Sequence, residues 1–119
     1  MAMTTAAVAV AGIFLSAPAS ASPAHASCGT AGPLLDGAIV IAAPAGDAVN
    51  QRSGTVAISS TNCPVVGVLQ TNDDAQYYCW TSGDDGFTWT YLRNLRTDVA
   101  GWSRDNLLDY NGSTIWCGF

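Results

Sequence analysis

The sequence has 119 residues, of which 49% are apolar, and this is enough material for one globular domain. Its charged residues are nine aspartates and four arginines, with no glutamate and no lysine, which gives a net charge of -5. Because nucleic acids and anionic lipids are bound through clustered basic side chains, this balance argues against both as partners.

The first 26 residues are typical of a signal peptide, with an apolar stretch over residues 6–17 followed by small residues. Ala-x-Ala patterns end at Ala21 and at Ala26. Cleavage is therefore expected before Ser22 or before Ser27, of which we prefer the second. The apolar stretch is shorter than the roughly 18 to 20 residues that cross a bilayer. The sequence thus predicts a secreted protein that does not insert into a membrane after processing.

Residues 27–37 are rich in Gly, Ser and Pro, and we expect them to form an N-terminal arm anchored by Cys28. Residues 38–119 are then the folded domain, in which short β-branched or aromatic runs alternate with turn residues. Seven strands are predicted, at Ala38–Ala43, Ala48–Arg52, Val65–Gln70, Ala75–Trp80, Phe87–Arg93, Val99–Ser103 and Thr114–Phe119. A short helical turn is expected within Arg104–Tyr110, and the C-terminal strand is expected to dock against the domain. Short strands at regular spacing predict an all-β barrel or sandwich.

Alternation along the strands indicates where the large rings point. In the predicted strand Phe87–Arg93, Phe87, Trp89 and Tyr91 share one face. The same rule places Tyr77 and Cys79 on one face of the preceding strand and Tyr78 and Trp80 on the other. Both faces of this part of the sheet therefore carry large rings, and one of them must be the core.

The four cysteines predict two disulfides, because an even count in a short exported chain is typical of a disulfide framework. Three pairings are open. We favour Cys63 with Cys79, across a hairpin, and Cys28 with Cys117, which would tie the termini together. The main alternative pairs Cys79 with Cys117. A domain of this size is marginal without such links, which each contribute roughly 2 to 4 kcal/mol.

Four motifs, in this order along the chain, resemble those of the bacterial SH3-like (SH3b) domain. They are the Asn-x-Arg-Ser-Gly strand end in Val49–Gly54, the Val-hydrophobic-Gly strand in Cys63–Leu69, the tryptophan strand Trp89–Leu92, and Gly101-Trp102 followed by Leu107-Leu108. The resemblance covers about half of the chain. It implies a partly open five-stranded barrel that binds peptides or cell-wall polymers, here free-standing.

The sequence departs from this family's pattern at three places. Thr55 stands where a proline usually follows Arg-Ser-Gly, and Ser103 stands where an apolar residue usually follows Gly-Trp. The diverging turn carries Asn72-Asp73-Asp74 in place of Gly and Lys. A ligand surface inherited from the family would therefore be acidic.

Catalytic chemistry is not predicted. Cleavage after Ala26 removes His25, the only histidine, and the chain has no lysine, so a nucleophile would lack a neighbouring base. The adjacent Asp84 and Asp85 lie between glycines, which is typical of a solvated turn rather than of an acid–base pair or a calcium site. No Cys-x-x-Cys spacing favours zinc. We therefore expect no enzymatic activity, no cofactor and no metal.

The remaining candidate site is aromatic and acidic. Rings stack on sugars and line peptide grooves, and nearby carboxylates attract amines. The residues that we propose for ligand binding are Tyr77, Trp80, Asp84, Asp85, Trp89, Tyr91 and Trp102. The sequence therefore favours a secreted binding module for a cell-wall peptide or glycan. The alternative is a secreted protein-interaction factor, such as an inhibitor or a signalling or competition protein.

Overall fold

The computed structural model describes residues 25–43, 46–58 and 62–119, and these form an all-β protein, as expected. The strands are β2 (Ile39–Ile41), β3 (Val49–Arg52), β4 (Val65–Leu69), β5 (Asp74–Ser82), β6 (Thr88–Asn94) and β7 (Val99–Arg104). Two short 3-10 turns, η3 (Asp105–Leu107) and η4 (Asp109–Asn111), fall near the expected helical turn. Residues 1–24 of the predicted signal peptide lie outside the described residues.

The C-terminal segment differs from its prediction. Residues 114–119 do not form a strand, and their one ladder contact is a parallel bridge between Trp80 and Trp116. Backbone hydrogen bonds from Trp80 to Ile115 and from Cys117 back to Trp80 hold the segment beside β5. The C-terminal tail is therefore docked, as expected, but as irregular chain.

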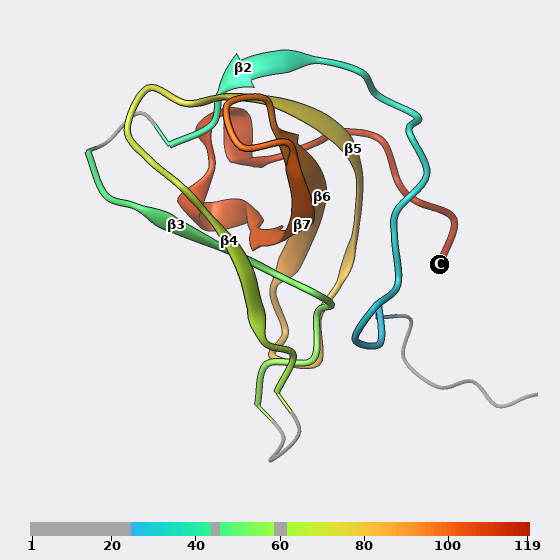
Figure 1. Cartoon of the computed structure of the whole chain (residues 1–119). Coiled ribbons are helices and arrows are strands. Elements are labelled where there is room, and N and C mark those ends of the chain that lie inside the picture. The colour runs from blue at the N-terminus through green and yellow to red at the C-terminus, as the bar shows by residue number, and fades with distance from the viewer. Residues whose placement is uncertain (1–24, 44–45, 59–61) are drawn as a thin grey trace, which may run out of the picture.

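The six strands form one antiparallel sheet in the order β2-β5-β6-β7-β3-β4. In Figure 1 this sheet curls around η3 and η4, with β3 and β4 on one side and β5, β6 and β7 on the other. The strands β2 and β4 are its two edges, so the sheet is not closed. The SH3-like architecture is not established by this topology and stays a prediction.

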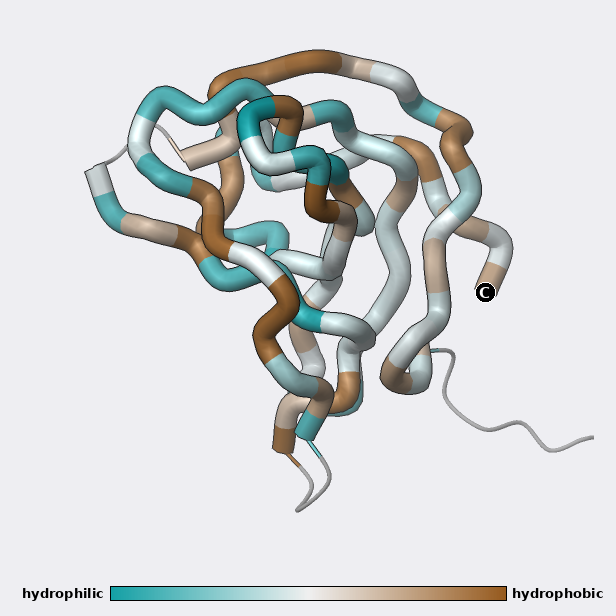
Figure 2. Tube along the Cα trace, viewed as in Figure 1, coloured by the Kyte–Doolittle hydropathy of each residue, from teal (hydrophilic) through white to brown (hydrophobic). Residues whose placement is uncertain are grey.

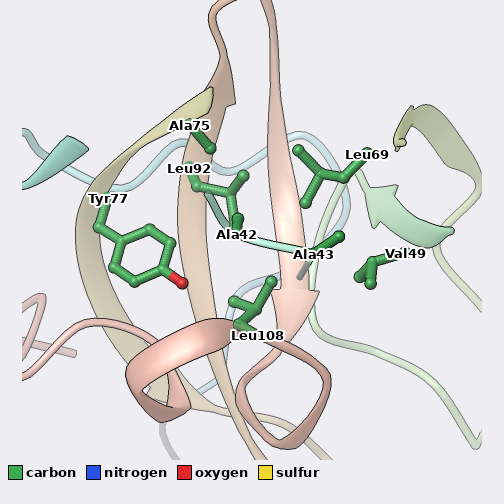
Figure 3. Packing of buried hydrophobic residues seen from close by; sticks show 8 residues of the cluster. All are labelled: Ala42, Ala43, Val49, Leu69, Ala75, Tyr77, Leu92 and Leu108. Atoms are coloured by element: carbon green, nitrogen blue, oxygen red, sulfur yellow. The ribbon is translucent and has the colours of Figure 1, made fainter. Parts of the chain in front are cut away.

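The inner face of the curled sheet holds the main hydrophobic core. Figure 3 shows its members converging from the strands and from the turn that follows β7: Ala42, Ala43, Val49, Leu69, Ala75, Tyr77, Leu92 and Leu108. The Tyr77 hydroxyl donates to the backbone oxygen of Asp109 over 2.7 Å, which links β5 to η4. Burial raises the pKa of this phenol above its ordinary range. Burying a side chain such as Leu92 contributes roughly 1.5 to 3 kcal/mol.

A second hydrophobic cluster lies on the outer face of the sheet. A β-bulge in β5 turns Cys79 toward this cluster. The ladder between β5 and β6 pairs Tyr77 with Leu92 and then Cys79 with Tyr91, so Tyr78 is an extra residue. The bulge reverses the alternation, and Cys79 therefore faces away from the core that contains Tyr77. The outer cluster consists of Ala26, Cys79, Trp89, Trp102 and Cys117, with Ala57, Tyr78, Tyr91 and Phe119 packed against it.

The N-terminal arm and the C-terminal tail cover this outer cluster. The indole of Trp102, which is fully buried, donates to the backbone oxygen of Thr30 in the arm over 2.7 Å. The Ser113 hydroxyl in the tail donates to Asp36 in the arm over 2.6 Å. In Figure 1 both segments run along the outside of β5. The sheet is thus covered on both faces, although one of the covers has no regular secondary structure.

Two disulfides fasten these covers to the sheet. All four cysteines are paired, as expected, but the favoured pairing is wrong, because the bonds join Cys28 to Cys63 and Cys79 to Cys117. The expected Cys63–Cys79 bond requires that β4 and β5 form a hairpin, with Cys63 just before β4 and Cys79 in β5. In the structure β4 pairs with β3 and not with β5, so the two sulfurs are not brought together. The alternative pairing of Cys79 with Cys117 is confirmed.

An ion pair closes the turn between β4 and β5. The Asp73 carboxylate is buried and accepts hydrogen bonds from the Arg96 guanidinium at 2.7 and 2.9 Å, from the Asn94 amide at 2.9 Å and from the Gln70 backbone at 2.8 Å. The Arg96 bond, with the other two donors, holds the pKa of Asp73 well below its usual range. Asp73 is therefore a structural residue and not a solvated turn former.

This ion pair predicts a specific acid sensitivity. A carboxyl group with a depressed native pKa stabilises the fold above the pKa of the unfolded chain, and that contribution is lost as the pH falls below about 4. We expect Asp73→Asn to be less stable than wild type at pH 7 and to lose less further stability between pH 5 and pH 2.5. Urea midpoints measured across this range check it, and parallel pH profiles for the two proteins would contradict it.

Candidate functional site

The structure separates the seven proposed ligand-binding residues into buried and accessible groups. Tyr77, Trp89 and Trp102 are nearly or fully buried, with exposed fractions of 2%, 3% and 0%. Tyr77 is part of the inner core and Trp102 is covered by the arm, so these two rings are structural. Trp80, Tyr91 and Asp84 are half-buried. The aromatic residues therefore do not form one exposed patch.

The two aspartates of the turn between β5 and β6 are engaged inside the molecule. One oxygen of Asp84 accepts the backbone N–H of Ala57 over 2.7 Å. Asp85, whose side chain is only 4% exposed, accepts the Trp89 indole over 3.1 Å and pairs with Arg104 over 2.9 Å. The expectation that both carboxylates of this turn are available to amines is therefore wrong for Asp85, which is neutralised by an internal cation.

The Asp85–Arg104 pair borders a concave site on the outer face of the sheet. This site, which we call the arginine pocket, has a volume of about 230 Å³. It is lined by Ala48, Asn50, Arg52, Trp89, Arg104 and Leu107. These residues come from β3, β6, β7, the end of the β2–β3 connection and η3. The pocket is therefore built where β3 and β7 meet.

Strand alternation explains why these side chains meet. In β3, Val49 and Gln51 are buried in the inner face, which turns the intervening Asn50 and the following Arg52 to the outer face. Arg52 pairs with Trp102 of β7, and Trp89 of β6 pairs with Arg104. A hydrogen bond from the Ser103 hydroxyl to the Asn50 backbone oxygen, 2.8 Å long, holds the two strands together here.

The two arginines of the pocket differ in their hydrogen bonds and ion pairs with the rest of the protein. The Arg104 guanidinium lies over the rings of Phe87 and Trp89, 4.5 and 5.4 Å from their centroids, and its Nε atom is buried without an acceptor among the described residues. Arg52 donates to the backbone oxygen of Cys63 over 2.9 Å. Of the chain's four arginines, all in the described ranges, it alone has no carboxylate within ion-pair distance. The pocket therefore contains one arginine that has no ion-pair partner among the described residues.

A second concave site lies between the arm and β7. It has a volume of about 200 Å³ and is lined by Gly29, Thr30, Ser53, Val66, Tyr91, Ala100 and Gly101. The Ser53 hydroxyl is buried without a partner among the residues that the structure describes. Burial raises the pKa of the Tyr91 phenol. Tyr91 is thus the one proposed ring that lines this site.

A further buried carboxylate, which sequence reasoning missed, lies at the start of η3. Asp105 is 4% exposed and accepts the hydroxyls of Thr88 and Thr90, both over 2.6 Å. Burial raises the pKa of this carboxyl, and the two hydroxyl bonds oppose the rise. The Thr90 hydroxyl also accepts the Ser113 backbone N–H over 2.8 Å. Thr90 therefore links the C-terminal segment to β6, and Asp105 holds the Thr90 hydroxyl in place.

Sequence reasoning missed Asn50, Arg52, Arg104 and Leu107, which line the arginine pocket, and the first two left a signal that could have been used. They occupy alternate positions of a short strand whose other positions, Val49 and Gln51, are buried. The resemblance to the SH3b domain identified the same segment as a strand end, but it did not indicate that Asn50 and Arg52 point outward. Arg52 is also one of only four arginines in an acidic chain, and three of these four lie on strands.

No protein-family model matches this chain, and no curated protein or solved structure matches it. Among residues 25–43, 46–58 and 62–119 there is no helix long and apolar enough to cross a membrane. The same residues contain no group of three or more His, Cys, Asp or Glu side chains placed to hold a metal ion. The class that the fold defines is thus a small all-β protein with two disulfides.

Proposed function

We propose that this chain is a secreted binding module, not an enzyme, and that it recognises a peptide or glycan of the cell wall through the arginine pocket. The observation that carries the proposal is that Arg52, in a concave site built on three strands, has no ion-pair partner among the described residues. Side chains held by a sheet are positioned without loss of loop entropy on binding. The disulfides and the SH3-like motifs support an extracellular setting.

The chemistry of the pocket supports binding rather than catalysis. Its polar side chains are two arginines and an asparagine, and neither type accepts a proton at neutral pH. Trp89 and Leu107 offer apolar surface beside these donors. A site of this composition can hold and orient a ligand, but it supplies no general base of its own.

Retention on purified insoluble cell wall tests the proposed function. Wild type is expected to sediment with the wall, and Asn50→Trp, which fills the pocket from an exposed position, is expected to remain in the supernatant. Gln70→Trp, at an exposed position that does not line the pocket, is the matched control and should sediment like wild type. Retention of wild type no greater than that of an inert acidic protein would refute the proposal.

A second candidate, a secreted protein-interaction factor, is favoured by an apolar surface along the arm and the edge strand β2. Figure 2 shows that β2, although it runs along the outside, is among the more hydrophobic parts of the chain. Its residues Ile39 and Ile41 are 59% and 43% exposed, and Leu34 and Leu35 of the arm are also exposed. Exposed apolar patches of this kind mark protein contacts. A stable complex with a soluble extracellular protein, formed without wall binding, would favour this candidate.

The burial of Ala26 supports a different cleavage site from the one preferred on sequence. Ala26 is 1% exposed, its N–H donates to the Thr55 hydroxyl over 2.8 Å, and its oxygen accepts the Thr55 N–H over 2.8 Å. Cleavage before Ser27 would remove these contacts and leave the Thr55 N–H without its acceptor. We therefore expect the secreted protein to begin at Ser22 and to keep His25, and the intact mass of the exported protein checks this. A mass that corresponds to a start at Ser27 would contradict it.

A further inference from the structure

The arginine pocket has an electrostatic balance that limits which ligands it can take. Arg104 is already paired with Asp85, whereas Arg52 has no carboxylate partner in the described part of the chain. The site therefore carries a net charge of about one positive unit on a protein whose formal charge is -5. A ligand with one negative charge balances the pocket. A polyanion would bring charge that the rest of the surface repels.

The donors of the pocket suit a planar anion. A guanidinium presents its N–H groups in a rigid fork that matches the two oxygens of a carboxylate. Arg52 uses one terminal nitrogen for the backbone oxygen of Cys63, and the remaining N–H groups of its fork are not engaged by any bond that the structure shows. The exposed Asn50 amide and the Arg104 guanidinium also line the same site.

Apolar surface lies beside these donors. The pocket also contains Trp89 and Leu107, and Leu107 is 53% exposed. A volume of about 230 Å³ accommodates a small acid with one short side chain rather than an extended polymer. The pocket thus combines a site for one anionic group with a neighbouring contact for an apolar substituent.

We propose that the arginine pocket recognises a carboxylate that carries a small apolar substituent, with Arg52 as the main binding residue. This inference rests on the proposed function, because it names the chemistry by which the same site would hold its ligand. The carboxylate of a peptide C-terminus and that of an acidic sugar share this chemistry. Arg104 and Asn50 orient the group, and Leu107 contacts its substituent.

Titrations followed by the NMR signals of the arginine Nε–H and tryptophan indole groups test the carboxylate. The probes are N-acetyl-alanyl-alanine against its C-terminal amide, glucuronic acid against glucose, and inorganic phosphate. We expect saturable shifts of the Arg52 Nε–H signal with one or both acids and no saturation with the amide or with glucose. The acid that binds more tightly identifies the source of the carboxylate. Binding of phosphate or of the amide as tight as that of the acids would overturn the inference.

Two variants connect this binding to the pocket. Asn50→Asp adds a negative charge at an exposed position and is expected to weaken binding of the better acid about tenfold or more, since a charge-assisted bond contributes on the order of a tenfold factor or above. Gln70→Glu adds the same charge outside the pocket and should change binding less than about twofold. Equal affinities for the two variants would overturn the inference. Thermal unfolding of both variants shows that each is folded.

The wall assay separates this inference from the proposed function. If the acids bind in the pocket and the wall does not retain the protein, the inference stands and the proposed function fails. If the wall retains wild type and Asn50→Asp equally well, the proposed function stands and carboxylate recognition is overturned.

Discussion

A variant in which Cys79 and Cys117 are both replaced by alanine is expected to lose about 4 kcal/mol of unfolding free energy. The two residues are 38 positions apart, and a link over a loop of that length restricts the unfolded chain by about this amount. The variant also releases the C-terminal tail from β5, which exposes part of the outer cluster. Because small domains have a total stability of about 5 to 15 kcal/mol, the loss takes a large share of it.

Urea unfolding of this variant, of wild type and of a Cys28→Ala, Cys63→Ala variant provides the measurement and its matched control. The control link spans 35 positions, so chain entropy predicts nearly the same loss. Cys79 is fully buried between two packed segments, whereas Cys28 is exposed. We therefore expect the Cys79–Cys117 variant to be the less stable of the two. A loss below about 1 kcal/mol in both variants would show that the covers hold without the links.

The second large effect is expected from Trp102→Ala, with a loss of about 3 to 5 kcal/mol. The side chain is fully buried, and its ring packs 5.0 Å from Tyr91 and 6.3 Å from Phe119, measured between centroids. Its removal leaves a cavity between the sheet and its outer cover and deprives the Thr30 backbone oxygen of its donor. A residue that the sequence placed in the ligand site is thus expected to act on stability.

Trp116→Ala is the matched control, because it makes the same chemical change at a side chain that is 53% exposed. We expect it to lower the unfolding free energy by less than about 1 kcal/mol. Urea midpoints give both values. If Trp102→Ala folded with wild-type stability but lost binding to cell wall, Trp102 would be a ligand residue after all, against its burial in the structure.

The positions of the strands could be predicted from sequence because short-range chemistry determines them. β-branched and aromatic residues favour the extended chain, and Gly, Asn and Asp end it at the turns. The predicted strand Phe87–Arg93 and the observed β6, Thr88–Asn94, differ by one residue at each end. The predicted strand Thr114–Phe119 failed because its residues have strand propensity but obtain only one bridge to a neighbour.

The faces of the sheet and the disulfide pairing could not be predicted, because one extra residue reverses them. Strict alternation puts Tyr77 and Cys79 on the same side, whereas the bulge at Tyr78 places them on opposite sides. No local sequence pattern here predicts the bulge, because a bulge depends on how two strands align. Once Cys79 faces outward, its neighbours are the arm and the tail. The sulfur of Cys117 in the tail then becomes its partner.

Only part of the candidate site could be predicted, because the rest depends on contacts between strands that are distant in the sequence. Two of the predicted ligand residues, Trp89 and Asp85, lie at the arginine pocket. Trp89 lines the pocket, whereas Asp85 forms an ion pair with Arg104. Arg52 and Arg104 meet across the junction of β3 and β7, which are far apart in the sequence. A long-range contact of this kind depends on the order of the strands, which single-sequence patterns do not specify.

The arm and tail that cover the outer cluster are attached through bonds that only an oxidising environment can form. A chain without these bonds would therefore hold its two covers less firmly over Trp102 and Tyr91. Such a chain is easier to unfold than its oxidised product. The stability of the outer layer thus depends on the redox state of four sulfur atoms.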